Sequence, residues 1–167
     1  MTGELILPLL MRWTHILAAI AALGGTLFLR LILIPAAAKA LGDEERKRLR
    51  EAVLGRWRVA VHVAIALLLI SGFYNYLGVT RFDHEGQGAY HALMGVKMLL
   101  ALVVFALAIL LTSRRPNSIQ ANTPKWQAIL IALTVAVVLI AGHLKLMPTQ
   151  RDDTINLRIP RVSVEVD

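Results

Sequence analysis

The sequence predicts an all-α integral membrane protein, a four-helix transmembrane bundle with antiparallel up-down topology and both termini on the outer face. Three observations favour this fold class. Hydrophobic residues make up 57% of the chain and the mean hydropathy is +0.63, whereas soluble domains are about 45–50% apolar. The apolar residues gather in four long blocks. Most Lys and Arg residues flank these blocks, which is the placement that orients a membrane protein.

Each apolar block is long enough for the roughly 20 residues that a spanning helix needs. Because backbone groups in lipid must be hydrogen-bonded within the chain, helices are the economical assignment. The first block exceeds the required length, so we expect it to tilt or to project from the bilayer. The blocks run over residues 5–38, 57–78, 89–112 and 126–147.

Polar connectors separate the blocks. Residues 41–56 form a charged stretch that we expect to extend the helices beyond the membrane. Residues 80–88 read as a turn-rich loop, and residues 113–125 contain Pro116 and Pro124 as helix breakers.

The chain is expected to form one transmembrane domain over residues 1–148. A polar extramembrane tail follows over residues 149–167. Within the tail, Ile155, Leu157 and Ile159 alternate with polar residues, which favours a short strand or an ordered tail. The amino-terminal block has Glu4 and no Lys or Arg before its apolar run, so we expect a helix that is retained and not a cleaved signal.

The distribution of basic residues orients the bundle. On one side, basic residues such as Arg81 are diluted by acidic ones such as Asp83. Because an excess of Lys and Arg marks the cytoplasm, we expect loops 39–56 and 113–125 to be cytoplasmic. The termini and the 80–88 loop are then outside, which is the periplasm for a bacterial inner membrane. The basic residues at and beside the two cytoplasmic loops are Lys39, Arg46, Lys47, Arg48, Arg50, Arg56, Arg58, Arg114, Arg115 and Lys125.

Several function classes are disfavoured. The absence of cysteine excludes disulfides, thiolate metal sites, c-type haem attachment and iron–sulfur clusters. The sequence contains no nucleophile elbow, phosphate loop or paired catalytic carboxylates, which argues against a hydrolase or a nucleotide-driven pump. The net charge of +7 is explained by membrane orientation, so the expected partner is the lipid bilayer and not nucleic acid. A membrane-protein partner or a homo-oligomer stays open.

Each apolar block contains one histidine. Ionisable groups inside a membrane are costly, which makes each a functional candidate. Because consecutive blocks cross the membrane in opposite directions, we expect His15, His91 and His143 in the outer half of the bundle. His62 then lies near the inner end of the second block. Imidazole ligates haem iron, copper and zinc, and facing helices build such sites. The pattern predicts a histidine site in the outer half; the alternative is that these are interhelical hydrogen-bond partners or interfacial residues.

Three methionines accompany these histidines at separations of three or four residues, which put each pair on one helix face. Thioether and imidazole ligands without thiolate or carboxylate suit copper(I) or a haem iron better than zinc or magnesium. The alternative is that the methionines only fill apolar space. The candidate metal ligands are His15 with Met11, His91 with Met94, and His143 with Met147.

Lys97 is the other unusual polar residue, about two turns into the third block. A lysine at this depth must snorkel, pair or bind an anionic group. The functional interpretation is a site for a haem or porphyrin carboxylate, or a proton-handling group; the alternative is snorkelling toward the headgroups. Asn75 and Tyr76, at the outer end of the second block, either line the same pocket or mark the interface.

Three segments resemble a known family. RWTHILAAIAALGGTLFLRLILIPA, GRWRVAVHVAIALLLISG and YHALMGVKMLLALVVFALAILLTSRR resemble successive helices of the copper-resistance protein D (CopD) domain and of the related HemJ-type membrane proteins. The resemblance covers residues 10–115, with a looser match to the fourth helix. It implies a four-helix membrane domain linked to copper uptake or tolerance. The HemJ-type branch implies haem b binding and protoporphyrinogen oxidation, with a first-helix histidine and a third-helix lysine that match His15 and Lys97.

Three hypotheses follow. The first is a haem b-binding or redox module, with His15 and either His91 or His143 as axial ligands and Lys97 near a propionate. The second is a copper uptake or tolerance module that uses the same histidines and the nearby methionines. The third is a cofactor-free structural or assembly subunit of a membrane complex. Whether the chain is an enzyme stays open.

Overall fold

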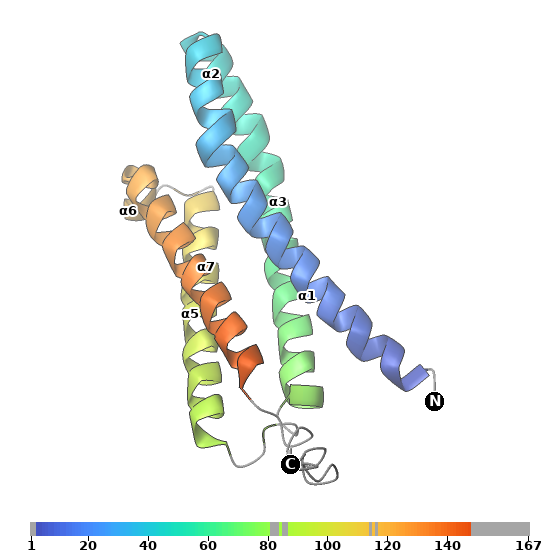
Figure 1. The fold of residues 1–167 in the computed structure, drawn as a ribbon. Helices are drawn as coiled ribbons and strands as arrows, with labels where there is room; N and C mark the ends of the chain where they lie inside the picture. The colour runs from blue at the N-terminus through green and yellow to red at the C-terminus, as the bar shows by residue number, and fades with distance from the viewer. Residues whose placement is uncertain (1–2, 81–83, 85–86, 114, 116, 148–167) are drawn as a thin grey trace, which may run out of the picture.

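The computed structural model describes residues 3–80, 84, 87–113, 115 and 117–147, which form long helices with short connectors (Figure 1). The tail at residues 149–167, with its predicted strand, lies outside the described residues. The helical elements are α1 (Gly3–Phe28), η1 (Leu29–Leu33), α2 (Ile34–Ala40), α3 (Asp43–Asn75), η2 (Tyr76–Thr80), α5 (Gly88–Thr112), α6 (Ser118–Ala121) and α7 (Thr123–Leu146).

Four helical stretches are long and apolar enough to cross a membrane, and they indicate a multi-pass membrane protein. The prediction of four membrane-spanning helices is therefore confirmed at the level of length and composition. The stretches are Ile6–Ala40, Asp43–Gly78, Gly88–Thr112 and Thr123–Leu146. The charged segment at residues 41–56 is almost entirely helical and forms the first turns of α3.

The surface of the bundle is apolar. Leu17 is 64% exposed and Leu139 is 68% exposed, and many other large apolar side chains are similarly uncovered. In water this surface would mark an interaction site or an aggregation hazard. Lipid tails are as apolar as leucine, so in a bilayer the same surface needs no protein cover.

The first long helix changes its hydrogen-bonding pattern just before Pro35. Proline has no backbone N–H, and its ring clashes with the carbonyl four residues earlier in a regular α-helix. The chain widens into the π-helical turn η1, and the Ile34 N–H donates to the Leu29 carbonyl, five residues back. Pro35 then occupies the start of α2, where its missing N–H costs least. The proline therefore shifts the hydrogen-bonding register of the helix, and the helix continues through α2.

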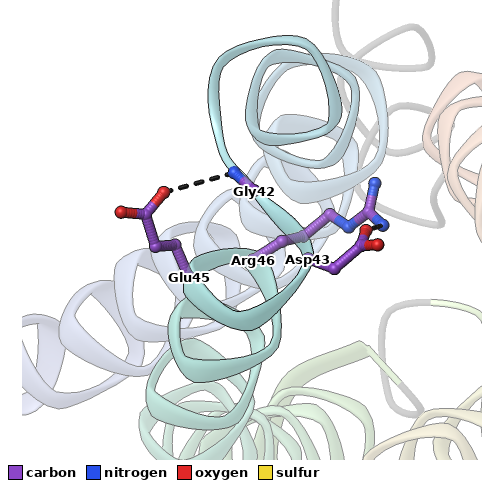
Figure 2. A network of polar contacts seen from close by, with 4 residues as sticks. All are labelled: Gly42, Asp43, Glu45 and Arg46. Carbon is purple, nitrogen blue, oxygen red and sulfur yellow. Dashed lines mark hydrogen bonds and ion pairs between the residues drawn. The ribbon is translucent and has the colours of Figure 1, made fainter.

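A two-residue connection joins α2 to α3. Leu41 is extended, with φ −119° and ψ 144°, and Gly42 precedes the first turn of α3. The Gly42 N–H donates to the Glu45 carboxylate over 3.2 Å, and Arg46 forms an ion pair with Asp43 (Figure 2). Acidic side chains in a first turn also suit the positive end of the helix dipole. These exposed contacts fix the local turn but contribute little stability.

The helices pack mainly as two pairs, α1 with α3 and α5 with α7, and the contacts between the pairs are fewer (Figure 1). Within the first pair, the Trp57 indole lies directly over Gly25, where any Cβ would overlap it. Small residues allow such close approach between membrane helices.

Two arginines connect the pairs at the end of the bundle near α6. Arg58 on α3 donates to the Thr112 carbonyl at the end of α5 over 2.6 Å. Arg30 in η1 donates to the Pro124 carbonyl in the first turn of α7, also over 2.6 Å. At Thr112, the last residue of α5, the cation satisfies a carbonyl at a helix C-terminus and complements the helix dipole. Beyond these contacts the α1–α2–α3 hairpin projects past α5 and α7 (Figure 1).

Candidate functional site

His15 and Ser71 join α1 to α3 through the bundle interior. Nδ1 of His15 lies 2.9 Å from Oγ of Ser71. Ser71 is completely buried, whereas the His15 side chain is partly buried. A polar pair in an otherwise apolar helix interface is unusual, because each polar group left unpaired in lipid costs free energy.

The hydrogen bonds of Ser71 determine the tautomer of His15. The Ser71 hydroxyl has one proton, which it donates to the Leu67 carbonyl one turn earlier over 2.5 Å. Its oxygen therefore accepts from His15, so Nδ1 of His15 carries a proton. In the neutral imidazole the lone pair then belongs to Nε2. The Leu68 carbonyl also lies beside this imidazole, 3.5 Å from the Ser71 hydroxyl, and no further hydrogen-bond partner of the ring is found among the described residues.

Gly72 provides space beside the same imidazole. A Cβ at Gly72 would lie 3.2 Å from Cε1 and 3.6 Å from Nδ1 of His15. The Nδ1–Cε1 edge of the ring therefore faces α3, and the Nε2 side is directed away from Ser71. An imidazole whose Nδ1–H is held by a second residue is the arrangement that metal-ligating histidines usually adopt.

The third polar residue of this region is Lys97 on α5. Its ammonium lies within electrostatic range of the His15 imidazole. Lys97 is partly buried, and no hydrogen bond or ion pair joins it to another residue in the part of the chain that the structure describes. An uncompensated cation in a membrane span favours an anionic group. His15, Ser71 and Lys97 are hereafter called the His15 site.

His91 belongs to a different cluster. Its Nε2 donates to the His84 carbonyl over 3.1 Å, because a carbonyl can only accept. Its Nδ1 lies 3.2 Å from the Tyr76 hydroxyl, which donates to it when the imidazole is neutral. Both ring nitrogens of His91 are therefore occupied by protein groups. This arrangement leaves no lone pair for a ligand unless one of these bonds breaks.

Aromatic rings and methionines fill the space around His91. The Tyr90 ring stacks on His84 with centroids 3.7 Å apart and planes at 9°. Tyr90 is 3% exposed and forms a buried apolar cluster with Met94 and Leu144, against which Met147 packs. Both methionines thus lie in an apolar environment, where a flexible thioether fills irregular space.

The remaining predicted residues lie apart from these two clusters. His143 is exposed, while the next residue, Leu144, is buried. Met11 is partly buried one turn before His15. His62 is exposed, and its Nδ1 bonds to the Arg58 carbonyl of its own helix. Within the described ranges, no group of three or more His, Asp or Glu side chains is arranged to hold a metal ion, so the joint site of His15, His91 and His143 stays a prediction.

Ser71 and Gly72, which contact His15 in the structure, do not stand out in the sequence. Ser71 sits in an apolar block in which single serines commonly bond back to their own helix, and Ser71 does so here as well. Gly72 follows it and reads as a small residue near a helix end. A Ser–Gly pair facing a histidine on a neighbouring helix becomes informative only once the rotation of both helices is known.

Comparisons with protein-family models, with curated proteins and with solved structures found no match for this chain.

Proposed function

We propose that this chain is an integral membrane protein that binds haem b at the His15 site, where Nε2 of His15 would ligate the iron. The observation that carries the proposal is the hydrogen bond from His15 to Ser71, because it leaves a lone pair on Nε2. Lys97 supplies a cation for a haem propionate. Bound haem would supply one-electron redox chemistry, while the protein orients the ligand and excludes water.

The proposal agrees with the resemblance to the CopD and HemJ-like proteins, which singles out a first-helix histidine and a third-helix lysine. His15 and Lys97 are far apart in the sequence and lie within electrostatic range of each other. We also propose an antiparallel bundle with both termini outside, since most basic residues lie at the opposite connectors. The His15 site would then lie in the outer half of the membrane.

The proposal is tested by expressing the full chain with ample haem precursor and recording the absorption spectrum of the purified protein. We expect a Soret band and one haem per chain in a pyridine haemochrome assay. Colourless protein would overturn the proposal. Elemental analysis then separates the alternatives, because stoichiometric copper would indicate the copper module. Metal-free protein that co-purifies with another membrane protein would indicate the structural subunit.

Replacing Ser71 by alanine should weaken haem binding about 10- to 100-fold, which is the usual effect of removing the group that orients a ligating histidine. The variant loses the acceptor that holds Nδ1–H, so the ring rotates and both tautomers become populated. Haem titration of apoprotein measures the change. Thr134→Ala is the matched control, because Thr134 also bonds back to its own helix, at Leu130, without contacting a histidine. Equal losses in both variants would contradict the orienting role.

Replacing Lys97 by methionine should reduce haem affinity about 10-fold or more, since a hydrogen bond to a charged group contributes roughly 1.5–3 kcal/mol. The informative comparison is between haem and its dimethyl ester, which lacks the propionate charges. The native protein should prefer haem, and the Lys97→Met variant should bind both alike. A variant that keeps the preference would place the propionate elsewhere.

A further inference from the structure

We propose that a groove on α3 beside Arg56 binds the phosphate headgroup and the upper acyl chain of an anionic phospholipid. The groove has a volume of about 260 Å³ and is lined by Val53, Arg56, Trp57 and Ala60. This site is separate from the His15 site and does not depend on haem binding. Its residues on α3 lie next to Arg58, which bonds to the end of α5, and the α1–α2–α3 hairpin projects past that end (Figure 1).

Among the described residues the Arg56 guanidinium has no protein partner, in contrast to Arg58, Arg30 and Arg46. Arg58 donates to the Thr112 carbonyl, and Arg30 donates to the Pro124 carbonyl. Arg46 is paired with Asp43. Arg56 is exposed, and within the described ranges no hydrogen bond or ion pair joins it to another residue. A guanidinium with all its donors available is suited to a phosphate, which it can bind through two parallel hydrogen bonds.

The groove lies at the level where the apolar span ends. The bond from Arg58 to Thr112 brings this part of α3 level with the last residue of α5. Arg56 is two residues nearer the charged turns of α3, about 3 Å along a helix axis. Trp57 lies between them, and tryptophan is enriched at the boundary between hydrocarbon and headgroups. A phosphate beside Arg56 and an acyl chain beside Trp57 match the order of groups in a phospholipid.

The walls of the groove are preformed and apolar. Val53, Arg56, Trp57 and Ala60 are spaced by three or four residues, so they share one face of α3. The Trp57 indole is held against α1 because it lies over Gly25. Ala60 is small and leaves open space beside the indole. The groove is open and its lining is almost entirely apolar, so Arg56 contributes mainly its aliphatic stem and its exposed guanidinium lies beside the groove. An apolar surface next to an exposed cation suits an amphiphilic anion better than a fully polar one.

The neighbouring charges favour an anionic lipid over a zwitterionic one. Arg48 and Arg50 lie on the same helix and are exposed, and the described part of the chain gives neither an ion-pair partner. Each basic side chain near a membrane surface favours anionic lipid by about fivefold. Arg56 alone lines the groove, so it should account for the bound lipid, whereas the others act only through the general surface charge.

Quenching of Trp57 fluorescence by brominated lipids tests this inference. The full chain carries Trp13→Phe and Trp126→Phe, so that Trp57 is the one remaining tryptophan, and is reconstituted in phosphatidylcholine vesicles. Brominated phosphatidylglycerol is compared with brominated phosphatidylcholine at equal mole fraction. We expect phosphatidylglycerol to be preferred about fivefold at Trp57. Arg56→Gln should abolish the preference, and Arg50→Gln, the matched control on the same helix, should retain it.

A second variant tests the groove independently of charge. Ala60→Leu fills the space beside Trp57 and leaves every basic residue in place, so it should lower quenching by the anionic lipid. Circular dichroism spectra and elution volumes in size-exclusion chromatography check that each variant keeps its fold. Equal quenching by the two lipids in the parent protein would overturn the proposal. So would an equal effect of Arg50→Gln and Arg56→Gln, because that result would indicate diffuse surface charge and no specific groove.

Discussion

The Soret band is expected to disappear when His15 is replaced by alanine, with haem affinity reduced more than about 100-fold. Loss of residues that merely support a ligating histidine already costs 10- to 100-fold, and this variant removes the ligand itself. The measurement is the haem content of protein purified after expression with ample haem precursor. Its effect should exceed that of every other single substitution in the bundle.

Two controls make the His15 experiment specific. His143→Ala should leave the spectrum unchanged, because that side chain is exposed. His91→Ala should leave the axial ligation unchanged, because both nitrogens of His91 already bond to protein groups. Adding imidazole to the His15→Gly variant should restore the band, since the small residue leaves room for the free ligand. Haem retained by His15→Ala but lost from His143→Ala or His91→Ala would contradict the assignment.

The second large effect is expected from Gly25→Ala, which places a methyl group where the Trp57 indole lies. Trp57 must leave its position or α1 must separate from α3, and overpacking of this kind costs about 1–3 kcal/mol. We expect a lower midpoint of thermal unfolding in detergent and an altered tryptophan emission spectrum. Gly24→Ala is the matched control, because nothing lies within 4 Å of a Cβ at that position.

A double variant identifies the cause of this destabilisation. Shortening the indole in Gly25→Ala with Trp57→Leu should recover part of the lost stability, because directly contacting residues show coupled effects in a mutant cycle. Strictly additive effects of the two substitutions would contradict the predicted contact. Equal losses in Gly24→Ala and Gly25→Ala would point instead to the backbone effect of replacing glycine.

The spans were predictable because hydropathy reports directly on what a bilayer tolerates. The third block, expected at residues 89–112, is the helix Gly88–Thr112. The second block, expected at residues 57–78, belongs to a helical stretch that begins at Asp43. Hydropathy detects the segment that lipid surrounds, whereas the helix continues through the charged residues, supported by its acidic first turn.

The site was only partly predictable. The sequence indicates how deep in the membrane a side chain lies, but it does not indicate how its helix is rotated relative to the neighbouring helices. His15 and Lys97 stand out as polar residues in apolar blocks, and they lie within electrostatic range of each other. His91 was expected at a similar depth, yet it bonds to Tyr76 and to the His84 carbonyl. His143 is exposed. The difference among the three histidines arises from which helix face each occupies, and that face is set by the packing of neighbouring helices.

The division of the bundle into two helix pairs has a consequence for how the protein is made. His15 and Ser71 both belong to the first pair, α1 with α3, whereas Lys97 belongs to the second. The first pair leaves the ribosome before the second, because it lies nearer the amino terminus. The imidazole can therefore acquire its hydrogen bond to Ser71 before Lys97 has entered the membrane. Assembly of the site follows the direction of synthesis, with the imidazole positioned before its electrostatic partner reaches it.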